Sequence, residues 1–243
     1  MHRFFVDSSL KNDNHVVITG DDVTHISKVL RLRHNDEITV CDPDGIDCLC
    51  RIETVEKDSV TAQIVSRVPS LTEPPIKITL FQGVPKGDKL DTVVQKCVEL
   101  GAMRVVPVAM KRSVAIIKDK EKKQQRLQKI ALEAAKQCNR AIVPQIDAVM
   151  TFDEAIGCSS DFDLKLLPYE AEKSTGMREA LKGSADAKNI CIFIGPEGGF
   201  DESEVEKARS SGFETVSMGP RIMRTETAPL AAITAVMYEL GDW

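Results

Sequence analysis

Apolar residues follow two different patterns along this chain, and the pattern changes near residue 75. In the first part, apolar and polar residues alternate over short runs that are separated by turn signals, as at residues 42–45. Alternation with a period of two predicts β-strands. The predicted strands cover residues 37–41, 48–55 and 60–65. Several short strands with tight turns are typical of a small barrel, so we expect a β-barrel at this end of the chain.

One helix is predicted within this first part. Apolar residues recur at helical spacing over residues 23–30, and Asp21 or Asp22 is a good N-cap. Basic side chains lie on the other face of this helix and just after it, at Lys28, Arg31 and Arg33. They are candidates for contacts with an anionic partner.

A proline-rich segment separates the two patterns. Residues 69–75, PSLTEPP, contain three prolines, which remove backbone donors and stiffen a linker. Beyond it, strands are predicted at residues 76–81, 105–108, 164–167, 189–194 and 215–216. Helices are predicted at residues 89–100, 120–138, 177–181, 202–211 and 227–240. This alternation is typical of a parallel sheet covered by helices on both faces. We therefore expect an α/β protein with a first domain at residues 1–70 and a second at 76–243.

Composition limits the classes of function. The chain is 42% hydrophobic and 28% charged, close to the average for globular proteins, and no apolar run approaches the ~18 residues of a membrane span. The first ten residues lack the apolar stretch of a secretory signal, and seven scattered cysteines form no CxxC pair, so we expect a cytoplasmic protein. All four histidines lie within the first 34 residues. The larger part of the chain therefore holds neither an HExxH metal site nor a Ser-His-Asp triad, and we expect no metal.

Charge is unevenly distributed. The net charge is −5, yet residues 86–140 hold 14 Lys and Arg against 6 Asp and Glu. An acidic protein with one basic stretch can bind a polyanion through a single face. The alternative interpretation is a solvated helix, for which the segment KDKEKKQQRLQK is well suited.

A glycine-rich loop follows the predicted strand at residues 189–194. The loop, IGPEGGF at residues 194–200, precedes a helix that Asp201 or Ser203 can cap. Three glycines allow a ligand to approach the backbone closely, and ligands of open α/β sheets bind at the carboxyl ends of strands. The motif is not a phosphate-binding loop, because Glu197 would repel phosphates. A ligand with a cationic centre fits better, and a turn without a ligand is the alternative.

Two further segments carry charge at predicted helix entrances. In SMGPRIMRTETAP, residues 217–229, Arg221 and Arg224 precede a helix that Thr225 or Thr227 can cap. These arginines concentrate positive potential beside the glycine loop if the two loops are neighbours; otherwise they face solvent. In QGVPKGDK, residues 82–89, two lysines can contact phosphates or lie in a plain surface loop.

Four segments together resemble one protein family. They are KVLRLRHNDEI near the N-terminus, KGDKLDTVVQKCVELG at residues 86–101, IGPEGGF and MGPRIMRTETAPLAA. The chain is similar over nearly its whole length to the ribosomal RNA small subunit methyltransferase E (RsmE) family. The resemblance implies a PUA-like barrel followed by a SPOUT domain with a trefoil knot. It also implies a homodimer that uses S-adenosylmethionine to methylate N3 of a uracil in 16S ribosomal RNA.

The resemblance also implies site residues. For the cosubstrate they are Leu166, Leu167, Pro168, Gly195, Pro196, Glu197, Gly198, Gly199, Met218, Gly219, Pro220, Ile222, Met223 and Thr225. A cation would stabilise the uracil anion that develops, and a carboxylate would take its proton. We expect Arg224 or Arg221 in the first role and Glu226 or Glu197 in the second, with a structural role for both pairs as the alternative.

Contacts with RNA are expected from basic and aromatic side chains. The candidates for phosphate contacts are Arg3, Lys28, Arg31, Arg33, Lys86, Lys89, Arg112 and Arg140. The candidates for base stacking are Phe4, Phe5 and Phe200. The chain departs from the family pattern at Asn35 and Asn139, where the family commonly has glycine, and at Lys111, where it often has an acidic or polar residue. RNA contacts near these positions are therefore left open. Two other classes of protein remain: an RNA-binding module without chemistry, and an enzyme that binds a small nucleotide in the glycine loop.

Overall fold

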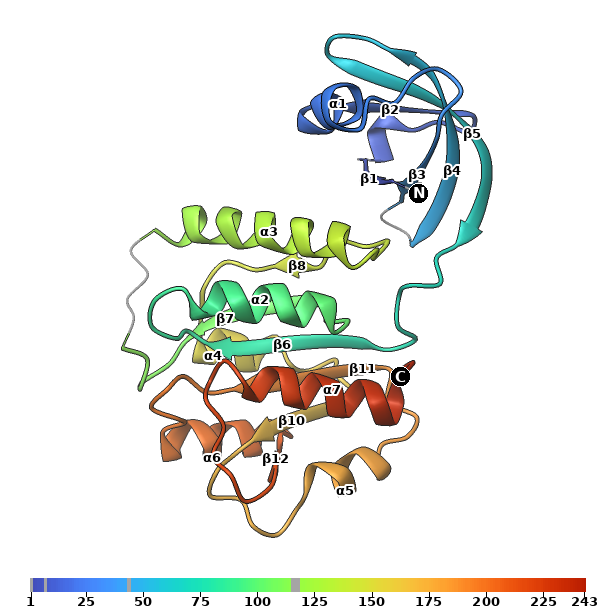
Figure 1. Cartoon of the computed structure of the whole chain (residues 1–243). Helices are drawn as coiled ribbons and strands as arrows, with labels where there is room; N and C mark the ends of the chain where they lie inside the picture. The colour runs from blue at the N-terminus through green and yellow to red at the C-terminus, as the bar shows by residue number, and fades with distance from the viewer. Residues whose placement is uncertain (1, 7, 43–44, 115–118) are drawn as a thin grey trace. The chain divides into compact units, whose positions relative to one another are not determined.

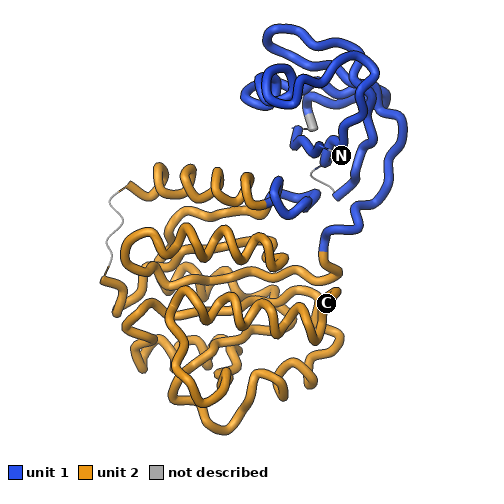
Figure 2. Tube along the Cα trace, in the orientation of Figure 1, with its two compact units in different colours: residues 1–73, 135–143 blue, residues 74–134, 144–243 orange. Residues whose placement is uncertain are grey.

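A computed structural model describes residues 2–6, 8–42, 45–114 and 119–243 of the chain. Two of the residues in the turn predicted at 42–45, Pro43 and Asp44, lie outside this described part. The chain divides into two units (Figure 2). Unit 1 comprises residues 1–73 and 135–143, and unit 2 comprises residues 74–134 and 144–243.

Unit 1 is built on a five-stranded sheet (Figure 1). Its strand order is β1 (Arg3–Phe5), β3 (Glu37–Cys41), β4 (Ile46–Val55), β5 (Ser59–Pro69) and β2 (His15–Thr19). β1 runs parallel to β3, and the other neighbours are antiparallel. Alternating side chains such as Ile38, Ile52 and Val60 are fully buried between the curled strands. The three predicted strands are confirmed, whereas the short strands β1 and β2 were not predicted.

The helical segment of unit 1 is irregular. After a 3₁₀ turn, η1 (Ser8–Leu10), and strand β2, one turn of α-helix, α1 (Asp21–Thr24), continues into a π-helix, η2 (His25–Leu30). The predicted caps Asp21 and Asp22 are wrong. Gly20, with φ of 72°, occupies the cap position, and no side chain hydrogen-bonds there. Both aspartates instead lie in the first turn, where their negative charge interacts favourably with the positive end of the helix dipole.

One carboxylate of unit 1 binds the segment at residues 135–143 through several hydrogen bonds. Glu73 accepts hydrogen bonds from the backbone N–H groups of Ala141 (2.8 Å) and Ile142 (3.0 Å), and it pairs with Arg140 at 2.6 Å. Arg140 is only 3% exposed. Burying a charge is costly unless it is paired and hydrogen-bonded, and this arrangement provides both. The guanidinium therefore anchors the segment.

Unit 2 contains a parallel sheet, as predicted. The strand order is β12 (Glu214–Val216), β10 (Leu164–Pro168), β11 (Asn189–Ile194), β6 (Lys77–Gly83), β7 (Arg104–Ala109) and β8 (Gln145–Ile146), with β9 (Met150–Thr151) also beside β7. Every pairing is parallel. The loops that follow β6, β10, β11 and β12 consequently leave from the same edge of the sheet.

Helices cover both faces of this sheet. They are α2 (Lys89–Glu99), α3 (Lys120–Gln137), α4 (Phe152–Gly157), α5 (Met177–Lys182), α6 (Glu202–Ser210) and α7 (Ala228–Leu240). In Figure 1, α2 and α7 lie on the near face, with α4 and α6 behind the strands. Phe193 of β11 stacks with Phe152 of α4 in the core below. Among the described residues, no helix combines the length and the apolar character that a bilayer crossing requires.

Candidate active site

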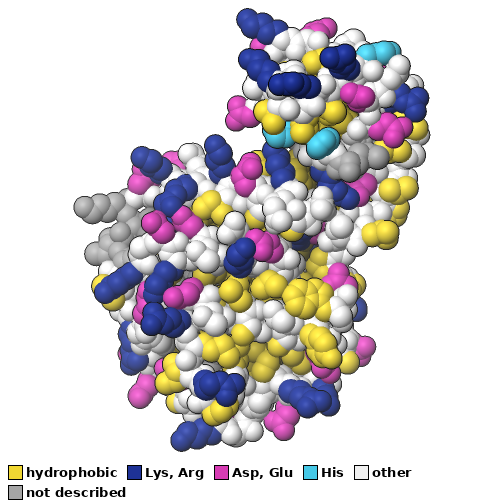
Figure 3. Space-filling model, viewed as in Figure 1, with side chains coloured by type: hydrophobic (Ala, Val, Ile, Leu, Met, Phe, Trp, Pro, Cys, Tyr) yellow, Lys and Arg dark blue, Asp and Glu magenta, His cyan; other side chains and the backbone are white. Residues whose placement is uncertain are grey.

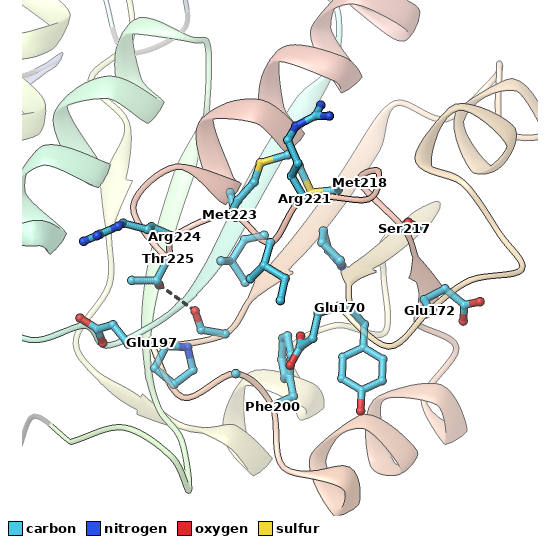
Figure 4. Close-up of a pocket in the computed structure, with 18 of the residues that line it drawn as sticks. Glu170, Glu172, Glu197, Phe200, Ser217, Met218, Arg221, Met223, Arg224 and Thr225 are labelled. Carbon is cyan, nitrogen blue, oxygen red and sulfur yellow. Dashed lines mark hydrogen bonds between the residues drawn. The ribbon is translucent and has the colours of Figure 1, made fainter.

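A pocket of about 940 Å³ lies in unit 2 where the parallel strands end (Figure 4). Three chain segments contribute most of its lining: residues 168–173 after β10, 194–200 after β11 and 217–225 after β12. Lys89 of α2 and Ala228 of α7 complete it. The glycine loop at residues 194–200 and the arginine segment at residues 217–225 therefore line one pocket. The two loops are neighbours, which the sequence left open.

A buried threonine fastens two of these segments together. Thr225 donates a hydrogen bond of 2.8 Å to the carbonyl of Gly195 and accepts one of 3.0 Å from Gln82 at the end of β6. Thr225 is therefore not a helix cap. Thr227 occupies the cap position of α7 without a side-chain hydrogen bond, and Pro229 lies in the first turn.

Close packing and backbone conformation explain two of the glycines. A Cβ atom at position 198 would lie 3.0 Å from Cβ of Arg112, and one at position 199 would lie 2.8 Å from Oε1 of Glu170. Gly199 also has φ of +68°, a conformation that side chains disfavour. Behind the loop, Asp201 caps α6 and accepts from the backbone N–H of Ser203, which decides between the two predicted caps.

Lys89 lies between two carboxylates. Its ammonium is 3.0 Å from Glu197 and 3.3 Å from Glu226. Glu197 also accepts from the backbone N–H of Lys86 at 3.1 Å. Burial would raise the pKa of Glu197, but hydrogen bonds from its own backbone N–H, Lys89 and Lys86 outweigh it, so this pKa lies below its ordinary value. Hydrogen bonding to Glu197 in turn raises the pKa of Lys89.

Glu172 organises the loop that follows β10. One carboxylate oxygen accepts from the backbone N–H groups of Lys173 (2.9 Å) and Ser174 (2.8 Å) and from the Ser174 hydroxyl. The other accepts from Thr215 of β12 at 2.6 Å. Hydrogen bonds from Ser174 and Thr215 lower the pKa of Glu172 to about 2. The carboxylate thus ties the first pocket segment to the strand that leads into the third.

Most residues predicted for the cosubstrate line this pocket. They are Pro168, Gly195, Pro196, Glu197, Gly198, Gly199, Met218, Gly219, Pro220, Ile222, Met223 and Thr225. Leu166 and Leu167 differ, because both are fully buried inside β10 and support the pocket from beneath. Arg221 and Arg224 are exposed lining residues whose guanidinium groups point in different directions in Figure 4. Glu226 is not one of the lining residues and lies next to Lys89.

Several lining residues were missed by the sequence analysis. They are Tyr169, Glu170, Glu172, Lys173, Ile194, Phe200, Ser217 and Ala228. Residues 169–173 follow directly after a predicted strand, and in a parallel sheet that position alone marks them as candidates. Phe200 was predicted to stack on RNA bases.

Two residues predicted to stack on RNA bases do not present a free ring. Phe200 is 2% exposed and packs edge-on against Phe193, and Phe4 is also 2% exposed, inside the core of unit 1. Rings buried in this way are unavailable for stacking, so these two predictions are wrong. Phe5 is half-buried.

The predicted phosphate contacts fall into two groups. Lys28, Arg31, Arg33, Lys86 and Arg112 are exposed. Arg140, by contrast, is buried against Glu73, and Arg3 forms two hydrogen bonds with Asp47 at 2.8 and 3.0 Å. For these two arginines the structure shows an internal carboxylate in place of a phosphate, and Lys89 likewise pairs with Glu197 and Glu226.

Departures from the family pattern have a backbone explanation at two positions. Asn35 has φ of 72° and Asn139 has φ of 61°. Asparagine tolerates this left-handed conformation better than most side chains, so it preserves the backbone that a glycine would adopt. At the third position, Lys111 donates its backbone N–H to Glu204 at 2.9 Å and its ammonium to Ser203.

Two protein-family models match the chain. One, described as an RNA methyltransferase domain, covers residues 72–237, and the other, described as an RNA methyltransferase PUA domain, covers residues 18–65. The first alone spans more than half of the chain. The α/β fold with a PUA-like N-terminal part and a methyltransferase part, which the resemblance implied, is thereby confirmed.

Relatives and solved structures agree with these models. The chain is 37% identical to the ribosomal RNA small subunit methyltransferase E of Bacillus subtilis, over 98% of this chain and 97% of that protein. A crystal structure of the corresponding enzyme from Neisseria gonorrhoeae, bound to S-adenosyl methionine, is 33% identical with a TM-score of 0.87, covering 100% of this chain and 99% of that one. A Legionella pneumophila methyltransferase in complex with the cofactor SAM is 29% identical with a TM-score of 0.84, covering 99% and 98%. The chain belongs to the ribosomal RNA small subunit methyltransferase E family, whose members are RNA methyltransferases.

Proposed function

We propose that this protein transfers a methyl group from S-adenosylmethionine to N3 of a uracil in small-subunit ribosomal RNA. The observation that carries the proposal is the convergence of residues 168–173, 194–200 and 217–225 on one pocket. Its volume, about 940 Å³, is within the range of sites for small molecules and cofactors.

The residues present fit a sulfonium donor. Three carboxylates, Glu170, Glu172 and Glu197, line the pocket beside the cations Lys89, Lys173, Arg221 and Arg224, and a carboxylate attracts a cationic sulfur. Met218 and Met223, which are partly buried, offer apolar surface for an adenine ring. Glycines 198 and 199 leave the loop without side chains on the approach to its backbone. When bound, S-adenosylmethionine supplies an electrophilic methyl group, which needs no metal for an in-line displacement.

The protein must then stabilise a uracil that loses its N3 proton. Arg221 and Arg224 are the cations for this purpose, since both line the pocket and neither forms an ion pair with a described residue. A guanidinium near the ring oxygens stabilises the developing anion electrostatically. Arg224 directly precedes Thr225, which holds the segment to the glycine loop, so its backbone is the better fixed of the two.

The two candidate proton acceptors differ in position, because Glu197 lines the pocket and Glu226 does not. Glu197 already accepts three hydrogen bonds, and its pKa lies below the ordinary value, which makes it a weaker base. Glu226 has one close partner, Lys89 at 3.3 Å, and its Oε2 is buried without a well-formed hydrogen bond in the described part of the chain. Lys89 thus positions both carboxylates.

Binding of ribosomal RNA rests on exposed cations. Lys28, Arg31 and Arg33 lie together at the end of the π-helix in unit 1, and Lys86 and Arg112 lie near the glycine loop in unit 2. Phosphate contacts of this kind dominate affinity for nucleic acids. We keep the division into an RNA-binding domain at residues 1–70 and a methyltransferase domain at 76–243 as part of the proposal.

A homodimer and a cytoplasmic location belong to the same proposal. Hydrophobic side chains gather over α7 in Figure 3, and Tyr238 and Trp243 are 72% and 57% exposed. An apolar helix face of this kind suits a two-fold interface. The trefoil knot implied by the resemblance stays a prediction. The cytoplasm is where small ribosomal subunits are assembled and used in bacteria.

One experiment tests the function directly. Small ribosomal subunits from cells lacking the protein are incubated with purified enzyme and methyl-labelled S-adenosylmethionine, and the RNA is digested and analysed by mass spectrometry. We expect one labelled nucleoside, 3-methyluridine. RNA binding without label would favour the non-catalytic module, and binding of ATP without RNA binding would favour the small-nucleotide enzyme.

A further inference from the structure

The three carboxylates that line the pocket differ in what they bind. Glu197 is paired with Lys89 at 3.0 Å, and Glu172 accepts hydrogen bonds from its own loop and from Thr215. Both carboxylates therefore already have protein partners that satisfy their charge. Glu170 differs, since it forms neither a hydrogen bond nor an ion pair with any residue that the structure describes.

The position of Glu170 is central. Figure 4 shows its side chain in the middle of the pocket, with Glu197 to one side and Glu172 to the other. Its Oε1 approaches the backbone of Gly199 so closely that a Cβ atom there would lie 2.8 Å away. The carboxylate of Glu170 thus lies directly against the glycine loop.

An unpaired carboxylate in this place selects by charge. An ionised carboxylate only accepts hydrogen bonds, so it attracts cationic groups and repels phosphates and other anions. Nearby carboxylates do not offset its charge, and Lys89 is already held by Glu197 and Glu226. A ligand that enters the pocket therefore meets the unpaired carboxylate of Glu170 together with the lining cations Lys173, Arg221 and Arg224.

We infer that Glu170 receives a cationic group of the methyl donor and is a specificity-determining residue of the pocket. The inference rests on the proposed function. S-adenosylmethionine carries two such groups, a sulfonium and an α-ammonium, and each can pair with a carboxylate. Pairing with the sulfonium would favour the substrate over the neutral-sulfur product, whereas pairing with the ammonium would hold both equally.

Calorimetric titration separates these cases. The wild-type protein and Glu170→Gln are titrated with S-adenosylmethionine, S-adenosylhomocysteine, which lacks the sulfonium charge, and 5′-methylthioadenosine, which lacks both charges. We expect Glu170→Gln to bind S-adenosylmethionine about tenfold more weakly, as for loss of a charge-assisted hydrogen bond. A matching loss for S-adenosylhomocysteine assigns the ammonium, and an unchanged affinity assigns the sulfonium. Affinity for 5′-methylthioadenosine should not change in either case.

A matched variant controls for net charge. Glu206 lies on the exposed face of α6 and is not a lining residue, so Glu206→Gln removes the same charge and should leave all three affinities unchanged. The inference is overturned if Glu170→Gln binds S-adenosylmethionine within twofold of wild type, or if it loses affinity for 5′-methylthioadenosine to the same extent. Failure of the wild-type protein to bind S-adenosylmethionine would instead overturn the proposed function, on which the inference rests.

Discussion

The hydroxyl of Thr225 donates a 2.8 Å hydrogen bond to the carbonyl of Gly195, 30 residues earlier in the chain. The same hydroxyl accepts from the amide of Gln82, so one buried oxygen joins the ends of β6 and β11 to the segment after β12. The cosubstrate pocket therefore depends on a polar contact inside the protein as well as on the residues that face the ligand.

Replacing Thr225 with Val tests this dependence. Valine keeps the shape of the threonine side chain but removes its hydroxyl, so the Gly195 carbonyl and one Gln82 N–H each lose a hydrogen-bond partner. The free energy of unfolding should fall by about 1–3 kcal/mol. Affinity for S-adenosylmethionine should fall as well, because the two loops are no longer fastened. Urea denaturation and calorimetry measure the two effects, and Thr225→Ser should restore both. A Val variant as stable as wild type would contradict this account.

Replacing Lys89 with Met tests the positioning of the carboxylates. Lys89 helps to hold the pKa of Glu197 below its ordinary value, so its loss should raise that pKa. Methylation that depends on ionised Glu197 should then lose activity at a higher pH, so the acid limb of the kcat/KM profile moves upward in pH. Turnover should also fall roughly 10- to 100-fold. Lys89→Arg, which keeps the charge, should retain most of the profile. A lower rate with an unmoved acid limb would point to a purely structural role.

Replacing Glu172 with Gln tests the loop after β10 by its pH dependence. The pKa of Glu172 is lowered from 4.5 to about 2. A lowered pKa in the folded state means that the ionised carboxylate stabilises the fold, fully above pH 4.5 and less as the pH falls toward 2. The difference in unfolding free energy between wild type and variant should therefore be largest at pH 7 and shrink at pH 3. A difference independent of pH would contradict the assignment.

Replacing Asn35 or Asn139 tests the backbone explanation of the departures from the family pattern. Both are exposed and have positive φ, at 72° and 61°. Asn→Ala should destabilise by about 1 kcal/mol, because alanine disfavours this conformation, whereas Asn→Gly should be neutral or slightly stabilising. Thermal unfolding of the four single variants measures both. Equal stability of the Ala and Gly variants would count against the explanation.

Replacing Lys28 with Ala tests the phosphate contacts of unit 1. Each phosphate contact contributes roughly 0.7–0.9 to the slope of log affinity against log salt concentration. The variant should bind small-subunit RNA more weakly at low salt and show a slope smaller by about that amount. Lys57, an exposed lysine in the turn between β4 and β5, provides the matched control, whose Ala variant should leave the slope unchanged. An unchanged slope for Lys28→Ala would exclude this contact.

The hydrophobic patterns along the sequence predicted most of the fold. The features that they did not predict depend on contacts between residues that are distant in the sequence. The parallel strands and their helices follow from runs such as residues 189–194, where local sequence and tertiary structure agree. The cap at Gly20 and the π-helix after it depend on how unit 1 packs, and apolar spacing does not distinguish a π-helix from an α-helix. The role of Arg140 was misjudged because its partner, Glu73, lies 67 residues away. A basic residue in a charged stretch gives no local signal of such a partner.

The candidate site was predictable where its residues form a motif. The glycine loop and the arginine segment are recognisable in the sequence, whereas Glu170 and Glu172 are two acidic residues in an ordinary polar loop. Only the sheet order, which places β10 between β12 and β11, brings that loop to the same edge. The pairing of Lys89 with Glu197 and Glu226 likewise emerges from the structure alone.

The pairing of β6 with β11 constrains when the pocket can form during synthesis. These central neighbours join Lys77–Gln82 to Asn189–Ile194, more than 100 positions apart. A ribosome-bound chain that has not yet released residue 194 cannot complete the sheet, and the last pocket segment follows even later. Contacts over such separations are slow to form. A nascent chain therefore has no complete donor pocket until residues 217–225 have left the ribosome and packed beside the glycine loop.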